Sequence, residues 1–369
     1  MKVSIYPEQH HLVNAFLVMF IIHSAQLGVG VQGFQRIIYM EAKHDAWMSV
    51  LLSGGIASII GFIMVKTLQS YESADLYGIQ RDVYGKWIGT FLNLVYVSYC
   101  LGAFLVIIRN YIEVLQAWVF PEVPTWFLAL TLMLLVLYGA LGGFRIIVGV
   151  SFFSVFLALW LLGLLSYPLQ YINWQNIMPM FEANTMDILK GTYAMTFTVI
   201  GFELMYSYYP YIKEKQKTTR YMQIGLAYTT FLYLAVMLVS LGYFSGGQLE
   251  RTIWATLSLF KIVRLPFIER FEYVAITFWM LIILPNLMLY IWSASRGVTR
   301  IFQWKEKTFI WIFSIFLFAA IQFFVTREQI NALSDLFGKV SFYVVYCYPI
   351  VLYIFVLIKK KVVRKGNAT

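Results

Sequence analysis

The sequence predicts an all-α integral membrane protein with about ten transmembrane helices, and three observations support that prediction. Of the 369 residues, 60% are hydrophobic and 12% are charged, about half the charged fraction of an ordinary soluble domain. Apolar stretches long enough to span a bilayer recur along the chain. Lys and Arg gather in alternate connecting segments. The composition therefore excludes a water-soluble monomer, a disordered chain and a secreted disulfide scaffold.

Charged residues, Pro or Gly separate ten apolar stretches, each suited to a hydrocarbon core about 30 Å thick. The predicted spans are residues 11–37, 46–67, 87–108, 125–143, 146–167, 190–212, 221–244, 271–295, 308–325 and 338–358. The first stretch continues past Gly28 without a small-residue cleavage site, so we expect a permanent span and not a signal peptide.

The segment between the seventh and eighth spans, residues 245–270, predicts a helix of a different kind. Apolar and basic residues alternate there at helical spacing, which indicates an interfacial or re-entrant helix. The residues are Ile253, Trp254, Leu257, Phe260 and Val263, with Arg251, Lys261 and Arg264 between them.

No linker is long or polar enough to separate soluble domains, so we expect a single transmembrane domain over residues 1–369. It divides into a first five-helix repeat (11–167), a second five-helix repeat (190–358) and a basic cytoplasmic tail (359–369).

Charge placement predicts the orientation. If the N-terminus is cytoplasmic, most of the 28 Lys and Arg residues fall in cytoplasmic segments, as the positive-inside rule requires. Both termini are then cytoplasmic and the number of spans is even, with ten fitting best and eight or twelve as alternatives. The same rule explains the net charge of +10 without a nucleic-acid partner; the partner that the composition predicts is the lipid bilayer.

Glycines interrupt two of the predicted spans. Gly28 and Gly30 lie in the first span, and Gly201 lies in the sixth. Backbone groups released inside a bilayer need partners, and a ligand's charged ends can supply them. The alternative is that these glycines only let neighbouring helices pack closely. Two broken spans, each leading five helices, favour an inverted repeat of five plus five helices with a binding site between the breaks.

Glu203 is the only acidic residue deep within a predicted span. Burial of a carboxylate at membrane depth costs at least ~2.5 kcal/mol, so three interpretations remain. It contacts a ligand amine or a proton, it anchors the unwound backbone, or it reaches solvent because the span is displaced. Gln26, Tyr96 and Asn286 are further polar residues that could face the same cavity or serve only in packing.

The sequence contains no catalytic or metal-binding motif. There is no HExxH, Walker A or GxSxG sequence and no Cys/His cluster. We therefore expect no enzyme activity, no cofactor and no metal site.

The residues Gly28-Val29-Gly30 and Ile200-Gly201-Phe202-Glu203 resemble the broken helices of the amino acid–polyamine–organocation superfamily, which has the LeuT-type fold. More narrowly, the chain length, the Pro7-Glu8-Gln9 opening and the run of spans resemble the spore-permease family, the GerAB-like B subunits of bacterial spore germinant receptors.

This resemblance implies a multi-pass subunit of the spore inner membrane. It would sense a small nutrient, an amino acid or a sugar, together with an A subunit and a lipoprotein C subunit. Carried over by position, the ligand would lie near Gly28, Val29, Gly30, Gly201, Phe202 and Glu203.

Two departures from transporters of this type favour sensing over uptake. The fifth span has no Lys to replace a coupling cation, and the eighth offers Pro285 and Asn286 where a sodium site would have Thr or Ser. Two alternatives remain: an amino acid or amine permease that works by alternating access, and an ion-channel-forming subunit.

Overall fold

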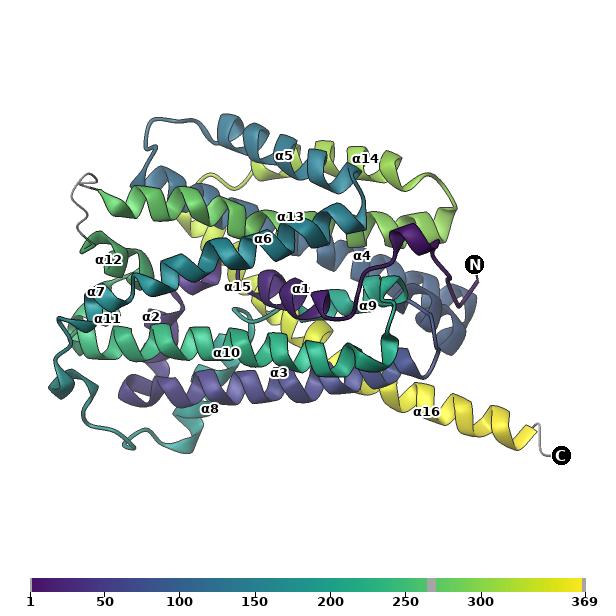
Figure 1. Cartoon of the computed structure of the whole chain (residues 1–369), viewed down its shortest axis with the longest axis horizontal. Helices are drawn as coiled ribbons and strands as arrows, with labels where there is room; N and C mark the ends of the chain where they lie inside the picture. Colours follow the sequence, from purple (N-terminus) through teal and green to yellow (C-terminus); the bar gives the residue numbers. More distant parts are fainter. Residues whose placement is uncertain (1, 264–269, 367–369) are drawn as a thin grey trace.

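The computed structural model describes residues 2–263 and 270–366 and shows a bundle of helices that run along one common direction (Figure 1). Six helical runs in the described part of the chain are long and apolar enough to cross a membrane, and shorter apolar helices accompany them. Both termini lie at the same end of the bundle (right in Figure 1), as an even number of spans requires.

The first repeat contains five spanning segments, of which the first is broken. That segment consists of α1 (Leu17–Gln26), the short 3-10 helix η2 (Val29–Gln32) and α2 (Phe34–Ala42). The other four are α3 (Ala46–Gln69), α4 (Leu76–Trp118), α5 (Thr125–Leu141) and α6 (Phe144–Gly163). A short helix α7 (Ser166–Leu169) and a loop lead to the second repeat.

The second repeat also begins with a broken segment. It consists of α8 (Thr185–Thr196), η5 (Phe202–Leu204) and α9 (Met205–Tyr208). The remaining four are α10 (Thr218–Tyr243), α13 (Phe271–Phe302), α14 (Glu306–Ile321), and the run of α15 (Arg327–Ser341), π-helix η8 (Phe342–Cys347) and α16 (Tyr348–Gly366). In the described residues, the helical bundle and its two breaks confirm the predicted fold class, and the five segments in each repeat agree with the predicted count of ten.

Two short helices occupy the segment for which an interfacial or re-entrant helix was expected. They are α11 (Gly246–Arg251) and α12 (Ala255–Lys261). Leu257 and Phe260 are buried, and α12 packs against α13, so this face is covered by protein. Arg264, which the sequence placed in the same helix, lies outside the described residues.

Two spans are longer than predicted. Asp75 caps α4 by accepting a hydrogen bond from Gly78 N–H at 2.9 Å, and a kink at Gly85 (φ +81°) separates the first turns from the main helix. Near the C-terminal end of the chain, α15 starts at Arg327, eleven residues before the start of the predicted tenth span at residue 338.

Arg109 departs from the expected gathering of Lys and Arg in the connecting segments. The predicted third span ended at residue 108, but α4 continues to Trp118 and Arg109 is only 1% exposed. Its guanidinium donates to the carbonyls of Phe324 and Val325 in the α14–α15 loop. These acceptors compensate the buried charge.

Two adjacent glycines on α3, Gly54 and Gly55, test the packing of α3 against α10. An added Cβ at Gly54 would lie 2.3 Å from Thr230 Oγ1 on α10, whereas one at Gly55 would meet nothing within 4 Å. We expect Gly54→Ala to destabilise the protein by about 1–3 kcal/mol through overpacking. Gly55→Ala should be neutral or slightly stabilising, since alanine favours the helix. Thermal unfolding of the purified variants in detergent measures the difference, and equal melting temperatures would contradict the predicted α3–α10 contact.

Candidate ligand site

The first break lies between α1 and η2. The helix ends at Gln26, and Gly28 has an extended backbone (φ −96°, ψ −160°) before η2 begins at Val29. The last carbonyls of an α-helix have no partner within the helix. Inside a bilayer such groups must be satisfied by protein or ligand.

Side chains of α10 and α13 donate to these carbonyls. The bonds are Asn286 Nδ2 to Ala25 O at 2.8 Å, Tyr233 OH to Gln26 O at 3.1 Å and Trp279 Nε1 to Gly28 O at 3.3 Å. All three donors are uncharged, so the break is stabilised without an ion pair.

The second break lies between α8 and η5, directly against the first. Gly201 adopts a left-handed conformation (φ +115°) that side chains disfavour. An added Cβ there would also lie 2.3 Å from Ala25 O. Glycine is therefore required both by the turn and by the contact between the two breaks.

Gln26 joins the two breaks. Its Nε2 donates to Val199 O at 2.7 Å. Tyr233 OH, which caps the first break, also reaches Thr198 O at 3.4 Å. The unwound parts of the first and sixth segments are thus held together by side-chain hydrogen bonds from both repeats.

Glu203 anchors the second break in this structure. Its carboxylate is 1% exposed and accepts three hydrogen bonds. The donors are Tyr99 OH at 2.8 Å, Tyr290 OH at 2.9 Å and Gly201 N–H at 2.6 Å. Tyr96 OH donates to the backbone carbonyl of the same residue at 3.1 Å. Of the three interpretations that the sequence left open, this geometry favours the backbone anchor.

A cavity of about 440 Å³ lies beside the two breaks. Five of the predicted site residues line it: Gln26, Gly28, Val29, Gly30 and Asn286. Phe197, Thr198, Ile200 and Tyr290 complete its base, and Ala103, Val106, Ile107 and Phe337 form a wall. The volume suits a small organic ligand.

The other predicted site residues, Tyr96, Gly201, Phe202 and Glu203, are not among the lining residues. They lie behind the cavity, and Tyr290 connects the two sets because it lines the cavity and donates to Glu203.

The cavity base offers two unused acceptors. The amide oxygens Gln26 Oε1 and Asn286 Oδ1 are buried and have no hydrogen-bond partner in the described part of the chain. The amide nitrogens are held by backbone carbonyls, and the reverse orientation would set oxygen against oxygen. Neither oxygen has accessible surface in this structure, so a bound molecule with N–H or O–H groups would satisfy them only after a shift of these side chains.

The cavity mouth carries charges that the sequence did not place in a site. They are Arg36, Glu113, Arg327 and Asp335, joined by Asn110, Asn331 and Ser334. Glu113 and Arg327 form an ion pair at 3.6 Å, and the Arg327 guanidinium lies 4.9 Å from the Trp254 ring centroid.

Apart from Arg36, which lies at the end of the predicted first span, these mouth residues were missed because the predicted third span ended at 108 and the predicted tenth began at 338. One signal in the sequence could have located the mouth residues on α15, which are Arg327, Asn331, Ser334 and Asp335. Thr326 and Gln329 form a capping box at the start of α15, and the pattern Thr-x-x-Gln is readable in the sequence.

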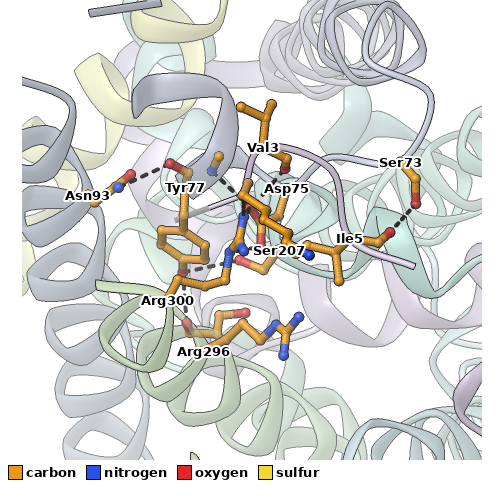
Figure 2. Close-up of polar contacts among 12 residues, drawn as sticks. Val3, Ile5, Ser73, Asp75, Tyr77, Asn93, Ser207, Arg296 and Arg300 are labelled. Carbon is orange, nitrogen blue, oxygen red and sulfur yellow. Dashed lines mark hydrogen bonds and ion pairs between the residues drawn. The ribbon is translucent and has the colours of Figure 1, made fainter. Parts of the chain in front are cut away.

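At the opposite end of the bundle, polar contacts hold the N-terminal segment against α13 and the segment before α4 (Figure 2). Arg300 on α13 pairs with the buried Asp75 at 3.2 Å and donates to the carbonyl of Lys2 at 2.6 Å. Ile5 N–H donates to Ser73 O at 2.7 Å. The cavity therefore opens at the end where α2 and α12 lie, away from both termini.

A second set of hydrogen bonds holds the N-terminal segment to the end of the sixth span. Val13 N–H donates to Tyr211 O at 2.9 Å, and Lys213 N–H donates to Val13 O at 3.0 Å. Ala15 N–H donates to the Glu214 carboxylate at 2.9 Å, which lowers the pKa of that carboxyl.

Replacement of the anchor tests its role. Glu203→Gln keeps the shape but loses one acceptor oxygen, so we expect a loss of about 1–3 kcal/mol in unfolding free energy. Glu122→Gln, at an exposed position, is the matched control and should unfold like the parent. Unfolding of both variants in detergent is the measurement, and a Glu203→Gln protein as stable as the control would remove the anchor role.

Solved structures of low sequence identity share this fold. A Na+-coupled sialic acid symporter in a substrate-bound outward-open state matches with a TM-score of 0.64 at 12% identity, covering 88% of this chain and 76% of the symporter chain. MhsT in complex with L-phenylalanine matches with a TM-score of 0.61 at 12% identity, covering 96% and 89%. These likenesses confirm the LeuT-type fold.

Sequence comparison identifies the family. Spore germination protein GerQB of Bacillus cereus is 35% identical over 352 residues, covering 95% of this chain and 98% of the relative. Spore germination protein A2 of Bacillus subtilis (strain 168) is 24% identical over 359 residues, covering 96% and 98%. The family model described as "Spore germination protein" matches residues 12–332. With this match and the two broken helices, the chain belongs to the spore germination protein family of multi-pass membrane proteins.

Proposed function

We propose that this chain is the nutrient-sensing B subunit of a spore germinant receptor and binds a small germinant, an amino acid or a sugar, between its two broken helices. The observation that carries the proposal is the cavity of about 440 Å³ beside both breaks. The family membership supports the biological setting. In this proposal the ligand leaves unchanged, and the protein has no catalytic step and no cofactor.

The two free amide oxygens define how the ligand is held. Both oxygens are buried beside the cavity in this structure. In this proposal a shift of the Gln26 and Asn286 side chains turns them toward an ammonium or hydroxyl group of the ligand. The charged residues at the mouth, Arg36 and Arg327 among them, face the more exposed end of the ligand. An amino acid and a sugar both carry the required donors.

Signalling would follow from a population shift. A ligand changes a conformational equilibrium only by its differential affinity for the two states. In this structure the cavity mouth is open and the opposite end is closed. We propose that the termini face the cytoplasm, that the protein resides in the spore inner membrane, and that the A and C subunits read the ligand-induced closure of the mouth.

An amino acid or amine permease is the second candidate, because the matched solved structures include a symporter. Uptake of labelled nutrients into liposomes that contain only this protein distinguishes the two. A sensor gives no accumulation, whereas saturable accumulation would establish the permease. Nutrient-independent ion currents across the same membranes would instead indicate a channel-forming subunit.

A cavity-filling substitution tests the ligand site. Ile107→Trp places an indole in the cavity wall, and Ile88→Trp places one on the exposed apolar surface of the same helix. We expect Ile107→Trp to raise the nutrient concentration for half-maximal germination at least about tenfold, equivalent to ~1.4 kcal/mol. Ile88→Trp should respond normally.

Germination assays at matched protein levels provide the measurement. Thermal-shift screening of the purified parent against amino acids and sugars provides the ligand. A ligand-induced shift that survives in the Ile107→Trp protein would show that the ligand binds elsewhere.

A further inference from the structure

The carbonyls at the two breaks form a set of negative dipole ends inside the bundle. In broken-helix membrane proteins such carbonyls can be neutralised by a bound cation or by hydrogen-bond donors. Whether a cation or a hydrogen-bond donor neutralises these carbonyls decides whether ligand binding depends on a metal ion.

In this chain uncharged side chains already donate to five of these carbonyls. The acceptors are Ala25, Gln26 and Gly28 at the first break and Thr198 and Val199 at the second. The donors come from α10, α13 and the first break itself.

Asn286 has the most central position among the donors. Its Nδ2 lies 2.8 Å from Ala25 O and 3.8 Å from the Cβ position of Gly28. The amide nitrogen therefore sits across the break, between the end of α1 and the start of η2. The residue is 2% exposed, and Pro285 precedes it in α13.

We propose that the Asn286 amide group fills the place of a cation at the first break, so that this site binds its ligand without Na+ or another metal ion. That the ligand binds without a metal ion rests on the proposed function. That Asn286 takes the place of a cation does not, because the break is present without ligand.

The physical argument predicts a specific gain of function. Asn286→Asp would replace the donor by a carboxylate oxygen that faces Ala25 O. Two acceptors at hydrogen-bond distance repel each other unless a cation or a proton lies between them, and alkaline pH disfavours the proton. The variant should therefore acquire the cation dependence that the parent lacks.

The experiment measures thermal unfolding of the ligand-free protein in detergent at mildly alkaline pH. Sodium chloride is compared with N-methyl-D-glucamine chloride at equal ionic strength. The variants are Asn286→Asp and, as the matched control, Asn331→Asp, which adds the same charge at the cavity mouth.

We expect the parent and Asn331→Asp to melt within about 1 °C in the two salts, because Asn331 is exposed and solvent screens a charge placed there. Asn286→Asp should gain about 3 °C or more in sodium. Saturable stabilisation of the parent by sodium would overturn the proposal. So would an Asn286→Asp protein that responds to sodium no more than Asn331→Asp does.

If Asn286→Asp does not fold, the sodium titration of the parent still decides the question. Where a ligand is known, its thermal shift on the parent should be equal in both salts. A shift seen only in sodium overturns cation independence and leaves the proposed ligand site intact, whereas failure to find any ligand affects the proposed function alone.

Discussion

The structure depends on one constraint: backbone groups that two helix breaks release inside a bilayer must find partners. Lipid offers no hydrogen-bond partner, and each group left unsatisfied away from water costs several kcal/mol. The chain meets the constraint with side chains from both repeats. Asn286 and Tyr233 cap the first break, and Gln26 ties it to the second. The cavity exists because these bonds keep the two unwound segments in place beside it.

The same bonds connect the cavity to the buried carboxylate. Tyr290 lines the cavity and donates to Glu203, which in turn accepts from Gly201 N–H. A ligand that moves Tyr290 therefore acts on the left-handed turn at Gly201 through two hydrogen bonds. Glu203 need not touch the ligand to influence the response.

The fold was predictable because bilayer thickness fixes the span length and because glycine marked both breaks. Five of the nine candidate residues line the cavity. They could be predicted because they belong to the glycine-marked first break or face it. The mouth was not predictable. Glu113 and Arg327 lie in helices that continue past their apolar sections, and a span predicted from hydropathy covers only the apolar section. Likewise, no pattern in the sequence shows that Tyr290 shields Glu203.

The two ends of the bundle differ in how firmly they are held, which bears on the choice between sensor and permease. The Asp75–Arg300 pair is 0% and 13% exposed and is reinforced by backbone bonds to the N-terminal segment, whereas the Glu113–Arg327 pair at the mouth is 16% and 45% exposed. Breaking a buried pair leaves an uncompensated charge and costs more than rearranging an exposed one. In the proposed function, ligand binding would therefore close the mouth more readily than it would open the opposite end. Closure of the mouth alone is what the proposed sensor needs, whereas a permease also needs the opposite end to open.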